Sequence, residues 1–301
     1  MISILMTLPC FIDILFFVVM FSSFEIQYFV FHCRRILKLI RDEYVSASKS
    51  VETDYQQESL QRMLKSEGSS SDWGKNVSDF KERVFEIIEE LTHDIDSCSE
   101  EISKQAIEHI HASEIILTIG RSRTVERFLK AAAKTRKFEV IVAEAAPDFS
   151  GHQMASNLAK AKISTTVITD SAIFAMMARV NKVIIGTQSI LADGTVVATS
   201  GAKTVALAAR HYSVPCIVLG AFYKLTPVYL PEGDCLVSNV LASPALVLQG
   251  PPDTNLRCLN PLFDSLPPSL VTLYISNISG YSPSYVYRQM GDLYHHQDRN
   301  L

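Results

Sequence analysis

The sequence predicts an α/β fold, with a doubly wound, mostly parallel sheet that follows a helical N-terminal region. Two observations carry this prediction. Short runs of consecutive apolar residues, rich in Val and Ile, recur between residues 114 and 220, and such runs suit strands that are covered on both faces. Segments with apolar residues at helical spacing separate the runs. Strands that alternate with helices in this way favour βαβ units and a parallel sheet.

The expected strands follow one another in chain order at Ile115–Ile119, Glu139–Ala143, Thr165–Ile168, Val183–Ile185 and Cys216–Leu219. The intervening helices are expected around Val125–Ala132, Met154–Ala161, Ile173–Met177 and Val205–Ala208. Crossovers between parallel strands are right-handed almost without exception, so a doubly wound layer is the simplest arrangement of these elements.

Ligands of open α/β sheets bind outside the carboxyl ends of the strands. Those ends lie here at residues 118–122, 144–147, 170–171 and 186–188. Together with a histidine that opens the second intervening helix, they supply the candidate residues for a pocket or an interface. The candidates are Gly120, Arg121, Ser122, Glu144, His152, Asp170 and Gln188.

The turn Gly120-Arg121-Ser122 leads directly from a strand into a helix. A glycine-containing loop at a helix N-terminus offers free N–H groups and a positive dipole end, which suit phosphate or carboxylate. The simpler interpretation, a plain turn with Ser122 as the N-cap, is preferred because neither GxGxxG nor GxxxxGK[ST] occurs in the chain.

Two further candidates have a structural interpretation beside the functional one. Asp170 precedes Ser171-Ala172 and fits a helix N-cap better than an acid or base. His152 either makes a hydrogen bond at the start of its helix or contacts a partner protein.

Composition narrows the function classes. The chain has 28 Lys and Arg against 32 Asp and Glu, and these charges are dispersed without a basic stripe, so direct binding of nucleic acid is not expected. The six cysteines show neither CxxC spacing nor a metal-binding quartet, which predicts no metal site. No cofactor is expected either. Such cysteine usage is typical of a reducing compartment and predicts the cytosol.

The first 31 residues are almost entirely apolar, but Asp13 and Glu25 interrupt them. A membrane-spanning helix needs about 20 apolar residues, and a carboxylate near the middle of the bilayer costs about 3 kcal/mol. A secretory signal would begin with positive charge and end on small residues, unlike this segment. Attachment to a membrane is therefore not expected. A buried helix or a segment foreign to the working protein is favoured.

A helical region is expected over residues 32–111. It begins with a short amphipathic helix at Arg34–Tyr44 and continues through an exposed polar linker at about residues 45–75. A long helix with one apolar face then extends from Phe80 to Ile102. Packing of this face inside the protein is preferred to a coiled coil, because the flanking charges lack a consistent pattern.

Two sequence blocks resemble the regulatory subunits of eukaryotic translation initiation factor 2B, a family that includes the alpha, beta and delta subunits. One block extends from ILTIGRSRTVERFL to VPCIVLG, and the other is NPLFDSLPPSLVTLYISNISGYSPSYVYRQMGDLYH. The second block points to the beta branch. The resemblance covers the chain from about Arg34 to its end and implies a Rossmann-like domain over residues 112–301. Residues 1–31 have no counterpart in the family, which suggests an error in the gene model.

This family shares its fold with isomerases of sugar phosphates, so the resemblance also bears on catalysis. Those enzymes carry a cysteine in a phrase like LTHCN, where this chain has Gly120, and an aspartate in a GAD phrase, where it has Gln188. An ESRP-like phrase, whose arginine helps to hold phosphate, is replaced by Glu144-Ala145-Ala146-Pro147. Sugar isomerisation needs a positioned proton donor and acceptor, and nothing in the sequence pairs Glu144 or Asp170 with a second group. Catalysis is therefore not expected.

The resemblance implies a non-catalytic subunit of the guanine-nucleotide exchange factor for initiation factor 2. Its partners would be the delta, gamma, epsilon and alpha subunits of the exchange factor, and initiation factor 2 through the alpha subunit of that substrate. Obligate interfaces bury roughly 2,000 Å² or more. Aromatic residues suited equally to an interface or a core crowd the last third of the chain: Phe222, Tyr223, Tyr229, Tyr274, Tyr281, Tyr285 and Tyr287.

Two other functions remain open at this point. One is a sugar-phosphate isomerase of the ribose 1,5-bisphosphate type whose catalytic groups have moved to new positions. The other is a membrane-tethered adaptor that uses the same fold.

Overall fold

A computed structural model describes residues 35–36, 38–43, 80–229, 239–248 and 256–294. The apolar segment at residues 1–31 and the polar linker at about 45–75 lie outside the described part. The chain divides into two units, residues 1–94 and 95–301. Among the described helices, none combines the length and the apolar character that crossing a membrane requires.

The long predicted helix is confirmed as α5, Phe80–Lys104. In the first unit, the Arg83 guanidinium lies 3.3 Å from the carboxylate of Glu43. In the second unit, Cys98 and Ile102 continue the apolar stripe of α5 and are fully buried. The short helix α6, Ala106–His109, follows and leads to the first strand.

The main sheet has seven strands in the order β10-β9-β7-β4-β1-β2-β3. Its strands are β1 (Ile115–Ile119), β2 (Glu139–Ala143), β3 (Ser164–Ile168), β4 (Lys182–Gly186), β7 (Cys216–Leu219), β9 (Leu273–Ile275) and β10 (Gly280–Tyr281). Every neighbouring pair is parallel except β9 with β10. The predicted doubly wound, mostly parallel sheet is confirmed, and all five expected strands agree with the structure to within one residue at each end.

Burial explains why the strands were visible in the sequence. All four residues of β7 and the last four of β1 are buried, as consecutive apolar runs require. Strand β3 differs, because it lies at the edge of the sheet and most of its residues are exposed or half-buried. Its threonines and its exposed Val167 suit an edge position better than the doubly covered position that its apolar run predicted.

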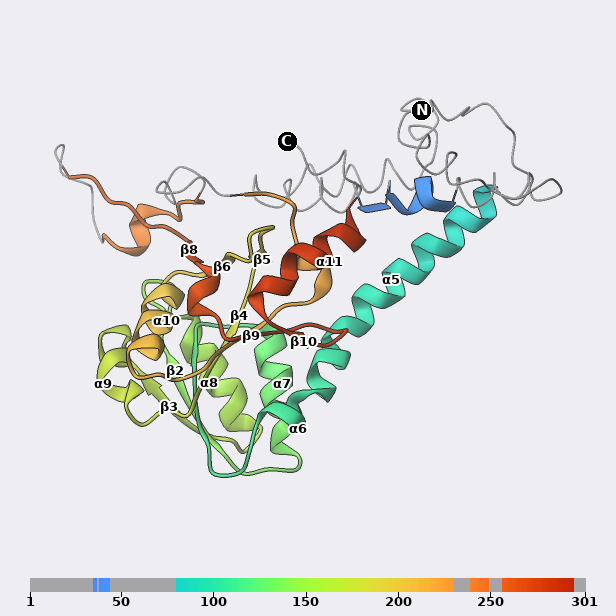
Figure 1. Ribbon diagram of the computed structural model, residues 1–301. Helices are drawn as coiled ribbons and strands as arrows, with labels where there is room; N and C mark the ends of the chain where they lie inside the picture. The colour runs from blue at the N-terminus through green and yellow to red at the C-terminus, as the bar shows by residue number, and fades with distance from the viewer. Residues whose placement is uncertain (1–34, 37, 44–79, 230–238, 249–255, 295–301) are drawn as a thin grey trace, which may run out of the picture. The chain divides into compact units, whose positions relative to one another are not determined.

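The connecting helices are α7 (Arg123–Ala133), α8 (Ser150–Lys160), α9 (Ile173–Met177) and α10 (Ala202–His211), and α11 (Val286–Leu293) ends the described chain (Figure 1). Helix α7 contacts α8, and α9 contacts α10. The chain winds from β1 toward β3 in one direction and from β4 toward β9 in the other. Right-handed crossovers therefore place the two helix pairs on opposite faces and make the boundary between β1 and β4 the switch point of the sheet.

A second, antiparallel sheet of three strands was not predicted. It has the order β5-β6-β8 and consists of β5 (Ser189–Ile190), β6 (Val196–Thr199) and β8 (Phe263–Leu266). Each strand has four residues or fewer, and β8 joins from more than 60 positions farther along the chain. Strands this short show no clear alternation, and partners so far apart in the sequence are not joined by a hairpin turn. The pairing of β6 with β8 therefore leaves no signal in the sequence.

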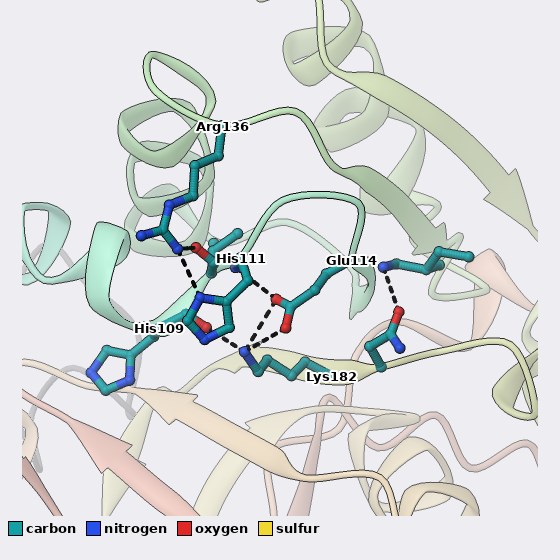
Figure 2. A network of polar contacts seen from close by, with 8 residues as sticks. His109, His111, Glu114, Arg136 and Lys182 are labelled. Carbon is teal, nitrogen blue, oxygen red and sulfur yellow. Dashed lines mark hydrogen bonds and ion pairs between the residues drawn. The ribbon is translucent and has the colours of Figure 1, made fainter.

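A polar network connects the end of α6 to the amino ends of the strands in the main sheet (Figure 2). The Lys182 ammonium donates to the carbonyl of His109 at 2.6 Å and to both carboxylate oxygens of Glu114 at 2.9 and 3.1 Å. The Glu114 carboxylate also accepts from the backbone N–H of His111 at 2.9 Å. Arg136 donates to the carbonyl of Ile110 and lies 2.8 Å from Nδ1 of the His111 ring. The loop between α6 and β1 is thereby tied to β4 and to the loop that follows α7.

The aromatic residues of the last third divide between core and surface. Phe222, Tyr274 and Tyr281 are buried, and the Tyr274 and Tyr281 rings stack with 5.8 Å between their centroids. Tyr229 and Tyr287 are exposed. The interface interpretation therefore applies only to the outward-facing part of this group.

Candidate functional site

A cavity of about 280 Å³ opens at the switch point between β1 and β4. This is where the ligands of open α/β sheets bind, because the strand ends and their loops diverge there. Three of the predicted candidates, Arg121, Ser122 and Gln188, line it. The remaining lining residues are Ile119, Arg123, Thr124, Ile185, Gly186, Thr187, Thr199, Tyr223, Lys224 and Phe263.

The predicted turn at residues 120–122 forms as expected. Ser122 has extended backbone angles and is the N-cap of α7, and its hydroxyl oxygen accepts from the N–H of Val125 at 3.5 Å. The structure thus supports the simpler interpretation of this serine. Gly120 has a φ of +59°, in the left-handed region that favours glycine. Arg121 points its guanidinium toward the side-chain oxygen of Gln153 at 2.8 Å.

Sequence reasoning missed Lys224, which lies in the short 3₁₀ turn after β7 and lines the same cavity. Its ammonium donates to the carbonyl of Thr187 at 2.6 Å. Burial lowers the pKa of Lys224 from its ordinary value, because the charged amine loses its hydration. The signal that could have found Lys224 is its position just beyond the carboxyl end of the fifth predicted strand.

The lining of the cavity is positively charged. Arg121, Arg123 and Lys224 are cationic, whereas the lining includes no Asp, Glu or Cys side chain. Such a surface can attract an anion, but it offers no carboxylate or thiol for proton transfer or nucleophilic attack. Lys224 is the one lysine in the lining, and a buried lysine of lowered pKa can act as a catalytic base.

The other candidates gather around the neighbouring ends of β2 and β3. The Asp170 carboxylate accepts from the backbone N–H groups of Ala145 at 3.0 Å and of Ala146 at 2.7 Å. The predicted capping role is therefore wrong. Thr169 occupies the N-cap position of the 3₁₀ turn that begins at Asp170, and the Asp170 side chain reaches across to the loop after β2 instead. The carboxylate thus accepts two backbone hydrogen bonds in that loop instead of one at the start of a short turn.

Glu144 and His152 form a pair in the structure. The Nε2 atom of His152 lies 3.5 Å from the Glu144 carboxylate, and the ring of His152 packs on Phe149 with 5.5 Å between centroids. The expectation that Glu144 lacks a second group is thus wrong, because α8 begins directly above the end of β2. His152 remains more than half exposed, so the pair faces solvent.

Gly120 lies between the two groups of candidates. A Cβ atom there would lie 3.3 Å from the Ser150 hydroxyl and 3.4 Å from Ala145 on one side, and 3.5 Å from Thr199 on the other. A thiol at this position would have to combine a left-handed backbone with those close contacts. The structure therefore divides the predicted single pocket into a cationic cavity and a separate Glu144–His152–Asp170 cluster.

No cluster of three or more His, Cys, Asp or Glu side chains suited to a metal ion occurs in the described part of the chain. Cys98, Cys216 and Cys258 form no disulfide, and the first two are buried. Burial raises the pKa of Cys216 to about 12, so this residue behaves as a small core side chain and not as a nucleophile.

Comparison with known proteins places this fold in a family. The model of the initiation factor 2 subunit family matches residues 45–283. Translation initiation factor eIF2B subunit beta of Dictyostelium discoideum is 45% identical over 230 residues, which are 75% of this chain and 59% of that protein. The chain thus spans about 59% of the length of this curated relative.

Solved structures agree with the sequence match. The crystal structure of eIF2B beta from Chaetomium thermophilum has a TM-score of 0.67 and 27% identity, and the match covers 90% of this chain and 74% of that one. The tetrameric eIF2B-beta2-delta2 complex from the same fungus matches with a TM-score of 0.64 and 27% identity, over 87% of this chain and 72% of the other. Because the family model spans most of the sequence, and the resemblance of the two sequence blocks points the same way, the chain belongs to the initiation factor 2 subunit family.

Proposed function

We propose that the chain is a non-catalytic regulatory subunit, of the beta type, in the guanine-nucleotide exchange factor for translation initiation factor 2. The observation that carries this proposal is the 45% identity to an eIF2B beta subunit over 75% of the chain. The cationic cavity supports it, because its lining includes no Asp, Glu or Cys side chain. In this proposal Gly120 and Gln188 replace the catalytic cysteine and aspartate of the isomerases that the family resembles.

The subunit acts in this proposal by presenting surface. It binds delta, contacts gamma and epsilon within an assembly that also contains alpha, and helps to hold the alpha subunit of initiation factor 2. When that substrate is phosphorylated, the assembly binds it in a way that suppresses exchange. The cytosol is where such a factor would meet its substrate.

An exchange assay tests this role. The exchange factor is reconstituted with and without the full chain, and GDP release from initiation factor 2 is followed with unphosphorylated and phosphorylated substrate. The proposal predicts that the epsilon subunit still releases GDP without the chain, whereas inhibition by the phosphorylated substrate requires it. Equal inhibition in the absence of the chain would contradict the regulatory role.

One observation favours a second candidate, the sugar-phosphate isomerase with relocated catalytic groups. Lys224 supplies an amine of lowered pKa inside a cationic cavity, which could hold a phosphate and move a proton. Turnover of ribose 1,5-bisphosphate by the full chain, abolished by Lys224→Met, would support the isomerase and overturn the non-catalytic assignment. The proposal predicts no turnover by either protein.

A further inference from the structure

We propose that the outer edge of β3 is a surface on which a second copy of this chain pairs, strand to strand, in an antiparallel register centred on Thr166. Strand β3, Ser164–Ile168, is the last strand of the main sheet. Among the described strands, β3 pairs with β2 alone, so one row of its backbone groups faces outward. The inference stands apart from the proposed function and does not require it.

A hydrogen bond at the end of β3 shows which backbone groups face outward. The carbonyl of Ile168 accepts from the N–H of Glu144 in the loop after β2 at 3.1 Å, so the backbone of Ile168 points toward β2. Because this direction alternates along a strand, Thr166 also points toward β2, whereas Thr165 and Val167 point outward. The outer edge therefore offers two N–H and two C=O groups.

An antiparallel second copy satisfies all four outward groups in one register. When Thr166 lies opposite its own counterpart, Thr165 lies opposite Val167 and the two exchange both hydrogen bonds. The two-fold axis repeats this pair on the other side of Thr166. A register centred on Thr165 would place Val167 opposite Ile163, whose N–H already donates to the carbonyl of Leu158 at 3.2 Å. The register centred on Thr166 is therefore favoured.

The side chains of β3 suit this pairing. Val167 is 44% exposed, and Thr165, which would lie opposite it, is half-buried. Cross-strand pairs of β-branched residues stabilise sheets, and this pair would cover Val167. Edge strands are commonly kept apart by Pro, Lys or a bulge, whereas β3 contains neither residue and pairs with β2 in an unbroken register.

The charges at the two ends of β3 identify a second copy as the occupant. Lys162 precedes the strand and Asp170 follows it, each four positions from Thr166. In the antiparallel register, Lys162 of each copy therefore lies beside Asp170 of the other, and opposite charges meet at both ends of the contact. An extended peptide from another protein would have to reproduce this reversed charge pattern, which a second copy of the chain supplies by symmetry.

The contact between two such short strands is small. Obligate interfaces bury roughly 2,000 Å² or more, and the pairing of two β3 edges falls well below that area. Self-association through β3 is therefore weak and depends on protein concentration. It becomes effective where two copies are already held in one assembly, because the effective concentration is then high.

Disulfide trapping in the full chain tests the register. Residues opposite each other in a non-hydrogen-bonded antiparallel pair have Cα atoms about 4.5 Å apart, within the reach of a disulfide. Two copies of Thr166→Cys meet in this geometry. Ser164→Cys is the matched control, because position 164 is also exposed and lies on the same face of the strand. The two thiols of that control would lie roughly 13 Å apart along the strand, too far to bridge.

We expect the Thr166→Cys dimer to form at least about tenfold faster than the Ser164→Cys dimer under mild oxidation, as measured on non-reducing gels. Equal rates in the two variants would overturn the inference. A Thr166→Cys rate no higher than that of the unaltered chain, with its six native cysteines, would also overturn it. Neither result bears on the proposed function, which does not depend on self-pairing.

A charge reversal tests the identity of the occupant. Lys162→Glu places a carboxylate beside Asp170 of the second copy and should weaken self-association at least about fivefold in sedimentation equilibrium. Lys160→Glu makes the same change at the exposed end of α8, outside the paired segment, and should alter it less than about twofold. Equal effects of the two reversals would overturn the assignment to a second copy.

Hydrogen exchange of the unaltered chain provides a measurement without a variant. When the protein concentration rises from about 1 to about 100 µM, the amides of Thr165 and Val167 should exchange more slowly, because pairing protects them. Slower exchange elsewhere with β3 unchanged would assign self-association to another surface and overturn the inference. Exchange that does not depend on concentration anywhere in the chain would overturn it as well.

Discussion

At the scale of single residues, Asp170 holds the loop after β2 in an unfavourable conformation. Ala145 and Phe149 in this loop have φ values of +58° and +53°, which non-glycine residues adopt only where their surroundings enforce it. The Asp170 carboxylate supplies part of that enforcement by accepting from two successive backbone N–H groups. Charge-assisted hydrogen bonds of this kind are among the stronger ones in proteins.

Replacing this carboxylate should loosen the loop. For Asp170→Ala we expect a loss of about 2 kcal/mol in the free energy of unfolding, because two backbone donors lose a charged acceptor. Urea unfolding at pH 7 measures the loss. The exposed Asp148 of the same loop provides the control, and Asp148→Ala should change stability by less than about 0.5 kcal/mol. Equal losses in the two variants would contradict the role given to Asp170.

Lys182 is the centre of the network in Figure 2. Lys182 and Glu114 are each 16% exposed, so the pair is largely removed from water. Burial opposes ionisation of Glu114, but the His111 N–H and the Lys182 ammonium outweigh it and hold the pKa of Glu114 below its usual value. This contribution to stability is therefore present above the unfolded pKa and is lost as the pH falls through the lower folded pKa.

Lys182→Met should cost about 2 kcal/mol in the free energy of unfolding at pH 7, because it leaves the Glu114 carboxylate without its cation and the His109 carbonyl without a donor. Lys130→Met is the control, since Lys130 is 38% exposed and pairs with Glu126 one turn away on the same helix. Because its cation reaches solvent, this pair should contribute only about 0.5 kcal/mol. A control loss as large as that of Lys182→Met would show that burial does not strengthen the network.

The sequence predicted the role of a single residue correctly where neighbouring residues set that role. It failed where the role depends on a hydrogen-bond partner far away along the chain. Ser122 was recognised as a cap because capping is set by its immediate neighbours. Asp170 was assigned the same role, yet its partners lie 24 and 25 positions away along the chain. Lys224 lies five positions beyond Leu219, the last residue of the fifth expected strand, and therefore outside the four strand ends that supply the predicted candidates.

At the scale of elements, the edge formed by β7, β9 and β10 carries buried groups that resist ionisation. Burial raises the pKa of Cys216 and that of Tyr281 to about 12, and it also raises the pKa of Tyr274. In the unfolded chain these groups lose their protons near pH 9 to 10. Their contribution is fully present below that range and is lost as the pH rises toward the folded values, because the unfolded state releases its protons first.

Alkaline pH should therefore destabilise the fold through these buried groups. We expect the free energy of unfolding to fall between pH 10 and 12, by up to about 1.4 kcal/mol per pH unit for each titrating group. Tyr281→Phe removes one such group and should therefore reduce the slope of stability against pH by up to about 1.4 kcal/mol per pH unit. Urea unfolding at several pH values from 8 to 11.5 measures the slopes. An identical slope in the variant would exclude Tyr281 as a contributor.

Elements were predictable in proportion to their burial and length. The five parallel strands were found because consecutive buried positions leave an unbroken apolar run, and α5 was found because 25 residues repeat one amphipathic pattern. Strand β8 escaped because it pairs with β6 from more than 60 positions away. Strands β5 and β6 form a local hairpin around Asp193-Gly194, but with two and four residues they are too short to show a strand pattern. Strand β3 was found, although its edge position exposes much of it.

At the scale of the whole molecule, the fold and the family were predictable, whereas the arrangement of the candidate site was only partly so. The switch point follows from strand order, which the sequence does not state, and it is strand order that separates Arg121, Ser122 and Gln188 from Glu144, His152 and Asp170. The resulting molecule has a cationic cavity whose lining includes no Asp, Glu or Cys side chain. This feature suits a subunit that works by binding.

The most direct test of this account is the mass of the native assembly that contains the chain. The full tagged chain is expressed in eukaryotic cells, purified without denaturant and weighed by native mass spectrometry. The account predicts recovery with delta, gamma and epsilon subunits of the exchange factor. Recovery of only a free chain, or of a homodimer without other subunits, would contradict it.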